Sequence, residues 1–356
     1  MILVDSRHDI FHRIDLPGGY EWTYYDGFDE RTGNGFTAIW FRGVPMSPHY
    51  AAAIDRIDHV SGTGANPRDF AAFAFNLYAG GSQVGSFFVE GREQVAGANE
   101  EIVFDGNRLV IEEQESEVWL SRRLVIDGQI PLTGTRLQGE IVAEGPRADL
   151  EAIVHTGRPA APDHYWVPAL PSGRFRGEVV RRRLAGRPQS FSMEGSLYHD
   201  RNFGFGPIQT SSVDWFWGRV HDGGRTLILF FVQNREGSES VDSPLQIRRA
   251  LLFEKDELVA SSEQLDLEAT MRNSWTTLKR PEKIVGRDPE SRLCVTVDTK
   301  RGLESGPFYH RLLAAFSYEW GERSGQGDGT LEYLRPDRLG VALIRPFVRF
   351  RVRRRR

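Results

Sequence analysis

The chain has 356 residues, of which 40% are apolar and 11% aromatic, so it can form hydrophobic cores and is not broadly disordered. A net charge of −4 gives no general attraction to nucleic acid, and we expect no nucleic-acid partner. The one cysteine, Cys294, forms no internal disulfide. The charged N-terminal segment is unlike a signal peptide, and no apolar run is long enough to span a membrane. We therefore expect a cytoplasmic protein.

Most of the chain has the pattern of short β-strands separated by Gly, Asp and Asn, which is typical of an all-β sandwich or barrel. Two pairs of strands are predicted hairpins because Gly-rich or Asp-Gly-Asn turns separate them. The predicted strands, in chain order, lie near residues 20–24, 70–78, 84–89, 102–104, 109–112, 118–125, 177–182, 226–233, 247–254 and 293–297. Residues 50–57 favour a helix, and residues 308–318 fit a helix or a strand equally well.

The length favours two domains, because single domains are commonly shorter than this chain. Four prolines fall between positions 159 and 171, a density that interrupts strand pairing and is typical of a connector. We therefore expect an N-terminal domain over residues 1–172 and a C-terminal domain over residues 173–356, both rich in strands.

The segment 192–219 holds a candidate acid beside aromatic side chains. Tyr198 and Asp200 are two residues apart, so on a strand they project from the same face. In a water-poor cavity, burial raises the pKa of a carboxyl group, which can then keep a proton and deliver it. The alternative is that Asp200 is a turn residue that binds backbone amides ahead of Asn202 and Gly204.

A second candidate pair, His164 and Trp166, also has the two-residue spacing of one strand face. The indole ring is the best side chain for holding a cation, and the imidazole could orient a hydroxyl or relay a proton. Either residue alone is also explained by a structural role, as a buried tryptophan or as a histidine bonded to a backbone carbonyl.

Other aromatic residues at alternate positions are candidate binding residues for an apolar ligand. These are Trp22 and Tyr24 near the N-terminus, and Trp215 and Trp217 with Asp214 and Phe216 on the opposite face. The alternative is that they are core residues of a β-sandwich. His8 and His12 lack a third ligand in a suitable frame, and no phosphate loop or Gly-x-Ser-x-Gly motif occurs, so we expect no metal and no cofactor.

The C-terminus, RPFVRFRVRRRR, alternates apolar residues with arginines and ends in four of them. We interpret it as a last strand that continues into a basic tail, which is either solvated or suited to peripheral contact with an anionic membrane. The expected partner is an apolar small molecule, and nothing in the sequence sets an oligomeric state.

Five motifs occur in one order along most of the chain: GGYEWTYYDG at 18–27, FRGVPMSPHY at 41–50, HYWVP at 164–168, GSLYHDRNFG at 195–204 and DWFWGR at 214–219. Together they resemble the carotenoid 1,2-hydratase (hydroxyneurosporene synthase) and AttH-like family. Plant tocopherol cyclases and fungal decalin-forming Diels–Alderases are similar at a greater distance. This resemblance implies two tandem lipocalin-like β-barrel or sandwich domains with a cavity at or near their interface.

The resemblance also implies a catalytic group made of His164, Trp166, Tyr198 and Asp200. In it Asp200 protonates a terminal isoprenoid double bond, and Trp166 and Tyr198 shelter the resulting cation. The chain departs from the family pattern at Arg201, Phe216 and Gly218. A pairing of Arg201 with Asp200 would lower the pKa of the acid, although neighbouring side chains on a strand face opposite sides.

Three functions agree with these patterns. The first is a hydratase or cyclase that protonates an isoprenoid or carotenoid-like polyene before water addition or ring closure. The second is a pericyclase that folds a polyene into a reactive shape, with a carbonyl polarised by Tyr198 or His164. The third is a lipocalin-like carrier that binds an apolar ligand without changing it.

Overall fold

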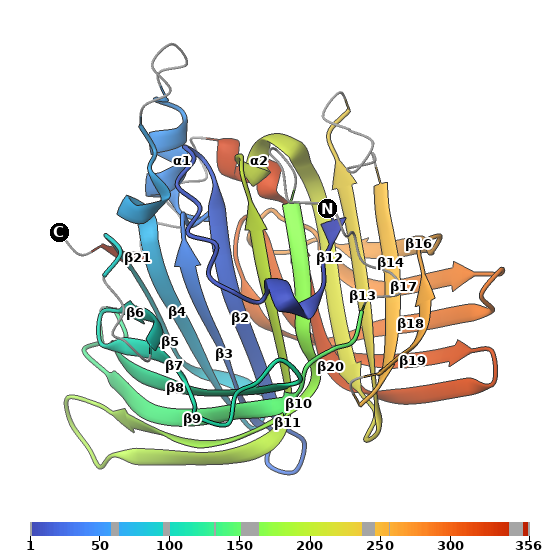
Figure 1. The fold of residues 1–356 in the computed structure, drawn as a ribbon, viewed down its shortest axis with the longest axis horizontal. Helices are drawn as coiled ribbons and strands as arrows, with labels where there is room; N and C mark the ends of the chain where they lie inside the picture. Colours follow the sequence, from blue (N-terminus) through green and yellow to red (C-terminus); the bar gives the residue numbers. More distant parts are fainter. Residues whose placement is uncertain are drawn as a thin grey trace. The chain divides into compact units, whose positions relative to one another are not determined.

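The computed structural model describes residues 2–57, 64–94, 100–131, 133–150, 164–236, 246–255, 257–341 and 352–354. They form two curled sheets with only short helices, which confirms the predicted all-β class (Figure 1). Within the described residues, no helix has the length and apolar character needed to cross a membrane.

Contacts divide the chain into two compact units: residues 2–207 group with the C-terminal residues 348–356, and residues 208–347 form the second unit. The boundary expected at residues 172/173 falls instead inside strand β10 (His164–Arg182). Pro168 and Pro171 coincide with shifts in the pairing of β10 with its neighbour β11 (Gln189–Gly204), between Val167 and Leu170 and between Leu170 and Gly173. These prolines therefore mark irregularities within a long strand, since proline cannot donate to the ladder. The two other prolines of the cluster lie outside the described residues.

The first unit is built on a 12-stranded sheet in which sequence neighbours pair mostly as antiparallel hairpins. The exceptions are β2 (Tyr20–Asp29), which pairs antiparallel with the distant β11, and the short strands β1 (Ile2–Leu3) and β21 (Val352–Arg354), which pair in parallel with β10 and β5 (Ser82–Gly91). The order across the sheet is β21 (Val352–Arg354), β5 (Ser82–Gly91), β4 (Ala71–Ala79), β3 (Asn34–Arg42), β2 (Tyr20–Asp29), β11 (Gln189–Gly204), β10, β9 (Arg136–Pro146), β8 (Trp119–Gln129), β7 (Asn107–Ile111) and β6 (Glu100–Phe104), with β1 (Ile2–Leu3) beside β10. Of the basic C-terminal tail, only β21 lies within the described residues.

The second unit is a nine-stranded antiparallel sheet. Its order is β15 (Glu257–Ser262), β14 (Gln246–Glu254), β13 (Arg225–Asn234), β12 (Ser212–His221), β20 (Arg323–Leu334), β19 (Tyr309–Trp320), β18 (Leu293–Ser305), β17 (Arg280–Asp288) and β16 (Asp266–Arg272). The ambiguous segment 308–318 is therefore a strand, whereas the helix expected at 50–57 is α1 (Pro48–Ile54). A second short helix, α2 (Ile208–Ser211), precedes β12.

Both predicted hairpins are present, as β4–β5 and β6–β7. The second turns at Asp105 and Gly106, whose φ angles of 54° and 84° fit the left-handed turn that matches the twist of paired strands. Alternation along the strands gives the first sheet two different faces. One face carries the apolar core, with Tyr25, Trp40 and Phe73 among its buried residues, and the other carries the candidate site.

Candidate functional site

The candidate acid lies in the middle of three adjacent strands, β2, β11 and β10. Pairing sets Asp200 opposite Tyr24, and sets Asn202 opposite both Trp22 and Trp166. Directly paired residues share a face in a sheet, and residues two apart return to the same face. One face of three strands therefore holds the predicted residues His164, Trp166, Tyr198 and Asp200 together with Trp22 and Tyr24.

The carboxyl group of Asp200 is buried and receives three hydrogen bonds from side chains. The Tyr198 hydroxyl donates to Oδ2 at 2.8 Å, and the Trp166 indole Nε1 donates to the same oxygen at 2.9 Å. Asn202 Nδ2 donates to Oδ1 at 2.9 Å. Asp200 therefore lies within a strand and binds side chains, unlike a turn residue.

His164 reaches this group through Asn202. Its Nε2 lies 3.2 Å from Asn202 Oδ1, and its Nδ1 lies 2.5 Å from the Tyr20 hydroxyl. Burial lowers the pKa of His164 well below its usual range and raises the pKa of Tyr20 well above its usual range. Both side chains are therefore neutral near pH 7. Sequence reasoning did not assign a site role to Tyr20 or Asn202.

Aromatic rings adjoin the acid along the same face. Trp22 stacks on Tyr20 with ring centres 5.3 Å apart and lies 5.6 Å from the His164 ring. Tyr24 meets Tyr198 edge to face at 6.2 Å. Such rings offer apolar surface to a hydrocarbon and a negative π-face to a cation. Rings of this kind are chemically suited to contact with an apolar ligand and to stabilising positive charge on it.

Trp215 and Trp217 lie on β12, in the second unit. Both are buried, and Trp215 packs edge to face on Phe230 with ring centres 5.1 Å apart. Phe216, on the opposite face, stacks on Tyr333 at 4.6 Å. The expected alternation is present, and a role for these tryptophans in substrate binding stays a prediction.

The side chain of Arg201 does not pair with Asp200. It is buried on the opposite face of β11, where Nε donates to Asp9 Oδ1 and an Nη donates to Glu21 Oε1, both at 3.1 Å. The carboxylates of Asp9 and Glu21 thus pair with the positive charge of the Arg201 guanidinium. Although the chain departs from the family pattern at Arg201, the guanidinium of this residue therefore faces away from Asp200.

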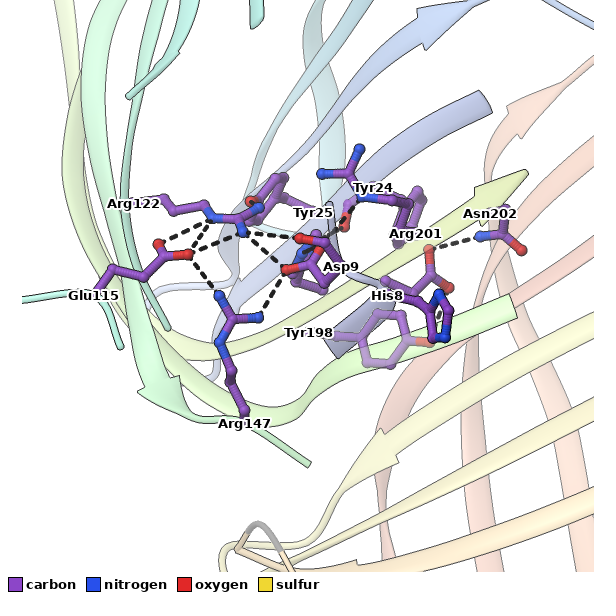
Figure 2. Close-up of polar contacts among 12 residues, drawn as sticks. His8, Asp9, Tyr24, Tyr25, Glu115, Arg122, Arg147, Tyr198, Arg201 and Asn202 are labelled. Atoms are coloured by element: carbon purple, nitrogen blue, oxygen red, sulfur yellow. Dashed lines mark hydrogen bonds and ion pairs between the residues drawn. The ribbon is translucent and has the colours of Figure 1, made fainter. Parts of the chain in front are cut away.

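Asp9 is the centre of a buried cluster of charges on this opposite face, shown in Figure 2. His199 Nε2 lies 3.1 Å from Oδ1, while Arg122 and Arg147 donate to Oδ2 at 2.9 and 3.0 Å. Glu115 binds both of these arginines. Burial alone would raise the pKa of Asp9, but the charges of Arg122 and His199 outweigh it and hold the pKa well below its usual range.

This cluster attaches the N-terminal segment to the back of the strand that carries the acid. One feature of the sequence points to this cluster. Glu21 is a charged residue that alternates with aromatic residues in a predicted strand, and Arg201 is a charged residue beside the candidate acid; buried charges of this kind are paired in folded proteins. The partner Asp9 could not be identified, because it lies far away in the sequence.

Comparison with known proteins gives a consistent result. A family model described as carotenoid hydratase CrtC matches residues 38–356. A protein of Chlorobaculum tepidum named hydroxyneurosporene dehydrogenase is 29% identical over an alignment of 362 positions, and the alignment covers 99% of this chain and 91% of that protein. The match confirms the resemblance inferred from the five motifs.

Two solved structures share the fold. The crystal structure of an AttH-type protein of Nitrosomonas europaea has a TM-score of 0.56 at 14% identity, covering 89% of this chain and 92% of that chain. The crystal structure of CghA has a TM-score of 0.50 at 12% identity, covering 90% of this chain and 88% of that chain. At these identities the similarity concerns the fold alone.

Proposed function

Since this chain belongs to the carotenoid hydratase CrtC family, we propose that it adds water to a terminal carbon–carbon double bond of an acyclic, carotenoid-like polyene. Family membership itself gives a hydratase-like enzyme of carotenoid metabolism with an apolar substrate. The observation that supports the finer assignment is the buried carboxyl group of Asp200, which receives hydrogen bonds from Tyr198, Trp166 and Asn202 on an aromatic face.

Asp200 acts as the general acid. The π electrons of the double bond form a new C–H bond with its proton, which leaves a tertiary cation on the adjacent carbon and a carboxylate on Asp200. Three donors already point at this carboxyl group, so they stabilise the negative charge as it develops and need no reorganisation. The oxygen of a water molecule then bonds to the cation. The surplus proton of that water restores the acid, so the net change is the addition of one water.

Aromatic rings stabilise the cation between the two steps. Trp166 and Tyr198 touch the acid itself, and Tyr24 packs against Tyr198. Their π-faces attract positive charge, and this attraction is larger where water is excluded. The same surface suits a hydrocarbon chain. The name of the Chlorobaculum tepidum relative refers to hydroxyneurosporene, and a polyene of this class is the substrate we propose here.

The test is to incubate the purified protein and its Asp200→Asn variant with an acyclic carotenoid in isotopically labelled water. We expect the wild type to form a product that has gained one water with the labelled oxygen, and the variant to form none while still binding the polyene. Product formation by Asp200→Asn at the wild-type rate would refute the acid role.

The mass of the product, together with its chromatographic retention time, also separates the competing functions. Ring closure started by a proton takes up solvent hydrogen without oxygen, and a pericyclic reaction takes up neither. A dehydrogenase product has lost two hydrogens, and a carrier returns the ligand unchanged. Any of these four results in the wild type would contradict hydration.

A further inference from the structure

Three hydrogen bonds connect four side chains of β2, β10 and β11 in a row that ends at the acid. The Tyr20 hydroxyl lies 2.5 Å from His164 Nδ1, and His164 Nε2 lies 3.2 Å from Asn202 Oδ1. Asn202 Nδ2 then lies 2.9 Å from Asp200 Oδ1. All four side chains are at least half-buried, and Tyr20, Asn202 and Asp200 are almost completely so.

The chemistry of the groups fixes the direction of every bond in this row. After proton transfer the Asp200 carboxylate only accepts, so the amide nitrogen of Asn202 faces it and the amide oxygen faces His164. An amide oxygen also only accepts, so His164 Nε2 carries the hydrogen. The ring is neutral because burial lowers the pKa of His164, which leaves Nδ1 as an acceptor for the Tyr20 hydroxyl.

We propose that Asn202 is a positioning residue for Asp200, and that Tyr20 and His164 hold its amide with the nitrogen turned toward the carboxyl group. An asparagine amide has almost the same shape after a half-turn, but the turned form would bring an oxygen against the carboxylate. The N–H of His164 selects the productive orientation, and the Tyr20 hydroxyl selects the tautomer of His164 that carries this N–H. The inference rests on the proposed acid role of Asp200.

This arrangement gives His164 a different role from a proton relay. Both ring nitrogens are engaged, one by Tyr20 and the other by Asn202, and the bond to the acid is made by Asn202. Tyr198, which donates to the acid, and Tyr24, which packs on Tyr198, are further titratable groups on the same face. On the opposite face of β11, His199 and Arg201 are directed at Asp9.

The first test compares Asn202→Leu and Tyr20→Phe with wild type in steady-state kinetics across pH. Loss of the Asn202 donor should lower kcat about 10²-fold with KM little changed, by analogy with single donors to developing negative charge. The alkaline fall of kcat should move to higher pH, because the carboxylate has lost a donor and the acid is weaker. Tyr20→Phe should also lower kcat and move its alkaline fall to higher pH, but both changes should be smaller than in Asn202→Leu.

The matched control is Thr23→Val, which removes a buried hydroxyl on the same strand as Tyr20 that has no hydrogen-bond partner among the described residues. It should leave kcat and its pH profile at the wild-type values.

The second test reads the tautomer directly and needs no substrate. Nitrogen NMR of protein with labelled histidine, assigned with the His164→Gln variant, should show a neutral His164 with the hydrogen on Nε2 at pH 7. Tyr20→Phe should convert this signal to a mixture of tautomers. A charged ring, or a hydrogen on Nδ1, would overturn the proposal, even where Asn202→Leu does not fold.

The acid role of Asp200 and the positioning role of Asn202 fail separately. Activity retained by Asp200→Asn refutes the acid itself. An inactive Asp200→Asn, combined with wild-type kcat and an unshifted pH profile in Asn202→Leu and Tyr20→Phe, refutes only the positioning role.

Discussion

Asp200 and Arg201 are consecutive in the sequence, yet their side chains belong to two separate networks on opposite faces of β11. Asp200 is bonded to neutral donors from Tyr198, Trp166 and Asn202, whereas Arg201 is bonded to the carboxylate of Asp9. The pleat of a single strand thus keeps an acid and a permanent cation apart although they are chain neighbours. This separation lets the back of the strand be fixed by charges while the front holds the acid.

The Tyr198 hydroxyl is expected to contribute to the rate rather than to the fold. Tyr198→Phe removes a donor to the carboxylate while keeping the ring, so kcat should fall about 10²-fold. Tyr25→Phe is the matched control, because it removes a hydroxyl that binds Arg122 on the opposite face. Steady-state kinetics should show an unchanged kcat for Tyr25→Phe. Equal losses in the two variants would contradict a specific role of Tyr198.

Asp9 is expected to stabilise the fold strongly. Asp9→Ala leaves the buried charges of Arg122, Arg147 and Arg201 without their shared partner, which should lower the free energy of unfolding by about 3–5 kcal/mol. Urea unfolding followed by tryptophan fluorescence measures this loss. Arg174→Ala, which breaks a largely exposed pair with Glu144, is the control and should change little. A similarly small effect of Asp9→Ala would show that the cluster is not needed.

Buried neutral histidines are expected to make the protein less stable in mild acid. Burial is the main cause that lowers the pKa of His164 well below its usual range and the pKa of His12 to about 4. Below about pH 6.5 the unfolded chain binds protons at these positions and the folded chain does not, so acid favours unfolding. With respect to these two histidines, the folded protein has its full stability above about pH 6.5. It loses stability as the pH falls toward the pKa values that the histidines have in the folded protein.

Urea unfolding at pH 7.5 and pH 5 tests this dependence. Replacement of His12, which packs on Phe203 with ring centres 3.9 Å apart, by Phe should reduce the difference between the two pH values. An unchanged difference would mean that His12 does not contribute to it. Asp9 acts in the same direction at lower pH, since its pKa is also held below the usual range.

Trp22 is expected to act mainly in substrate binding. Trp22→Ala removes a ring from the aromatic face, and the loss of one large apolar contact should raise KM about tenfold or more. The exposed Trp275, between β16 and β17, provides the control, and Trp275→Ala should leave KM unchanged. A fall in kcat with constant KM in Trp22→Ala would instead place this ring in the chemical step.

The sequence allowed the local structure and part of the site to be predicted, because both depend on short spacings. Two-residue spacing placed Tyr198 with Asp200 and His164 with Trp166 on one face, and the Asp105–Gly106 turn identified its hairpin. Pro168 and Pro171 were misleading, because a long strand absorbs them through register shifts.

The contacts between distant segments could not be predicted. Asn202 and Tyr20 act through bonds that depend on the register of three strands, and nothing in their local sequence sets that register. Asp9 binds His199 and Arg201 across about half the chain. Charge alone does not tell which of the many acidic residues will meet a given arginine.

The most direct test of the central claim is the position of deuterium in the product formed in heavy water. If Asp200 protonates the polyene, each product molecule carries one deuterium on the carbon next to the new C–O bond, and Asp200→Asn forms no such product. A hydrated product without deuterium at that carbon would show that the new C–H bond does not come from an acid in exchange with solvent, and would contradict the account.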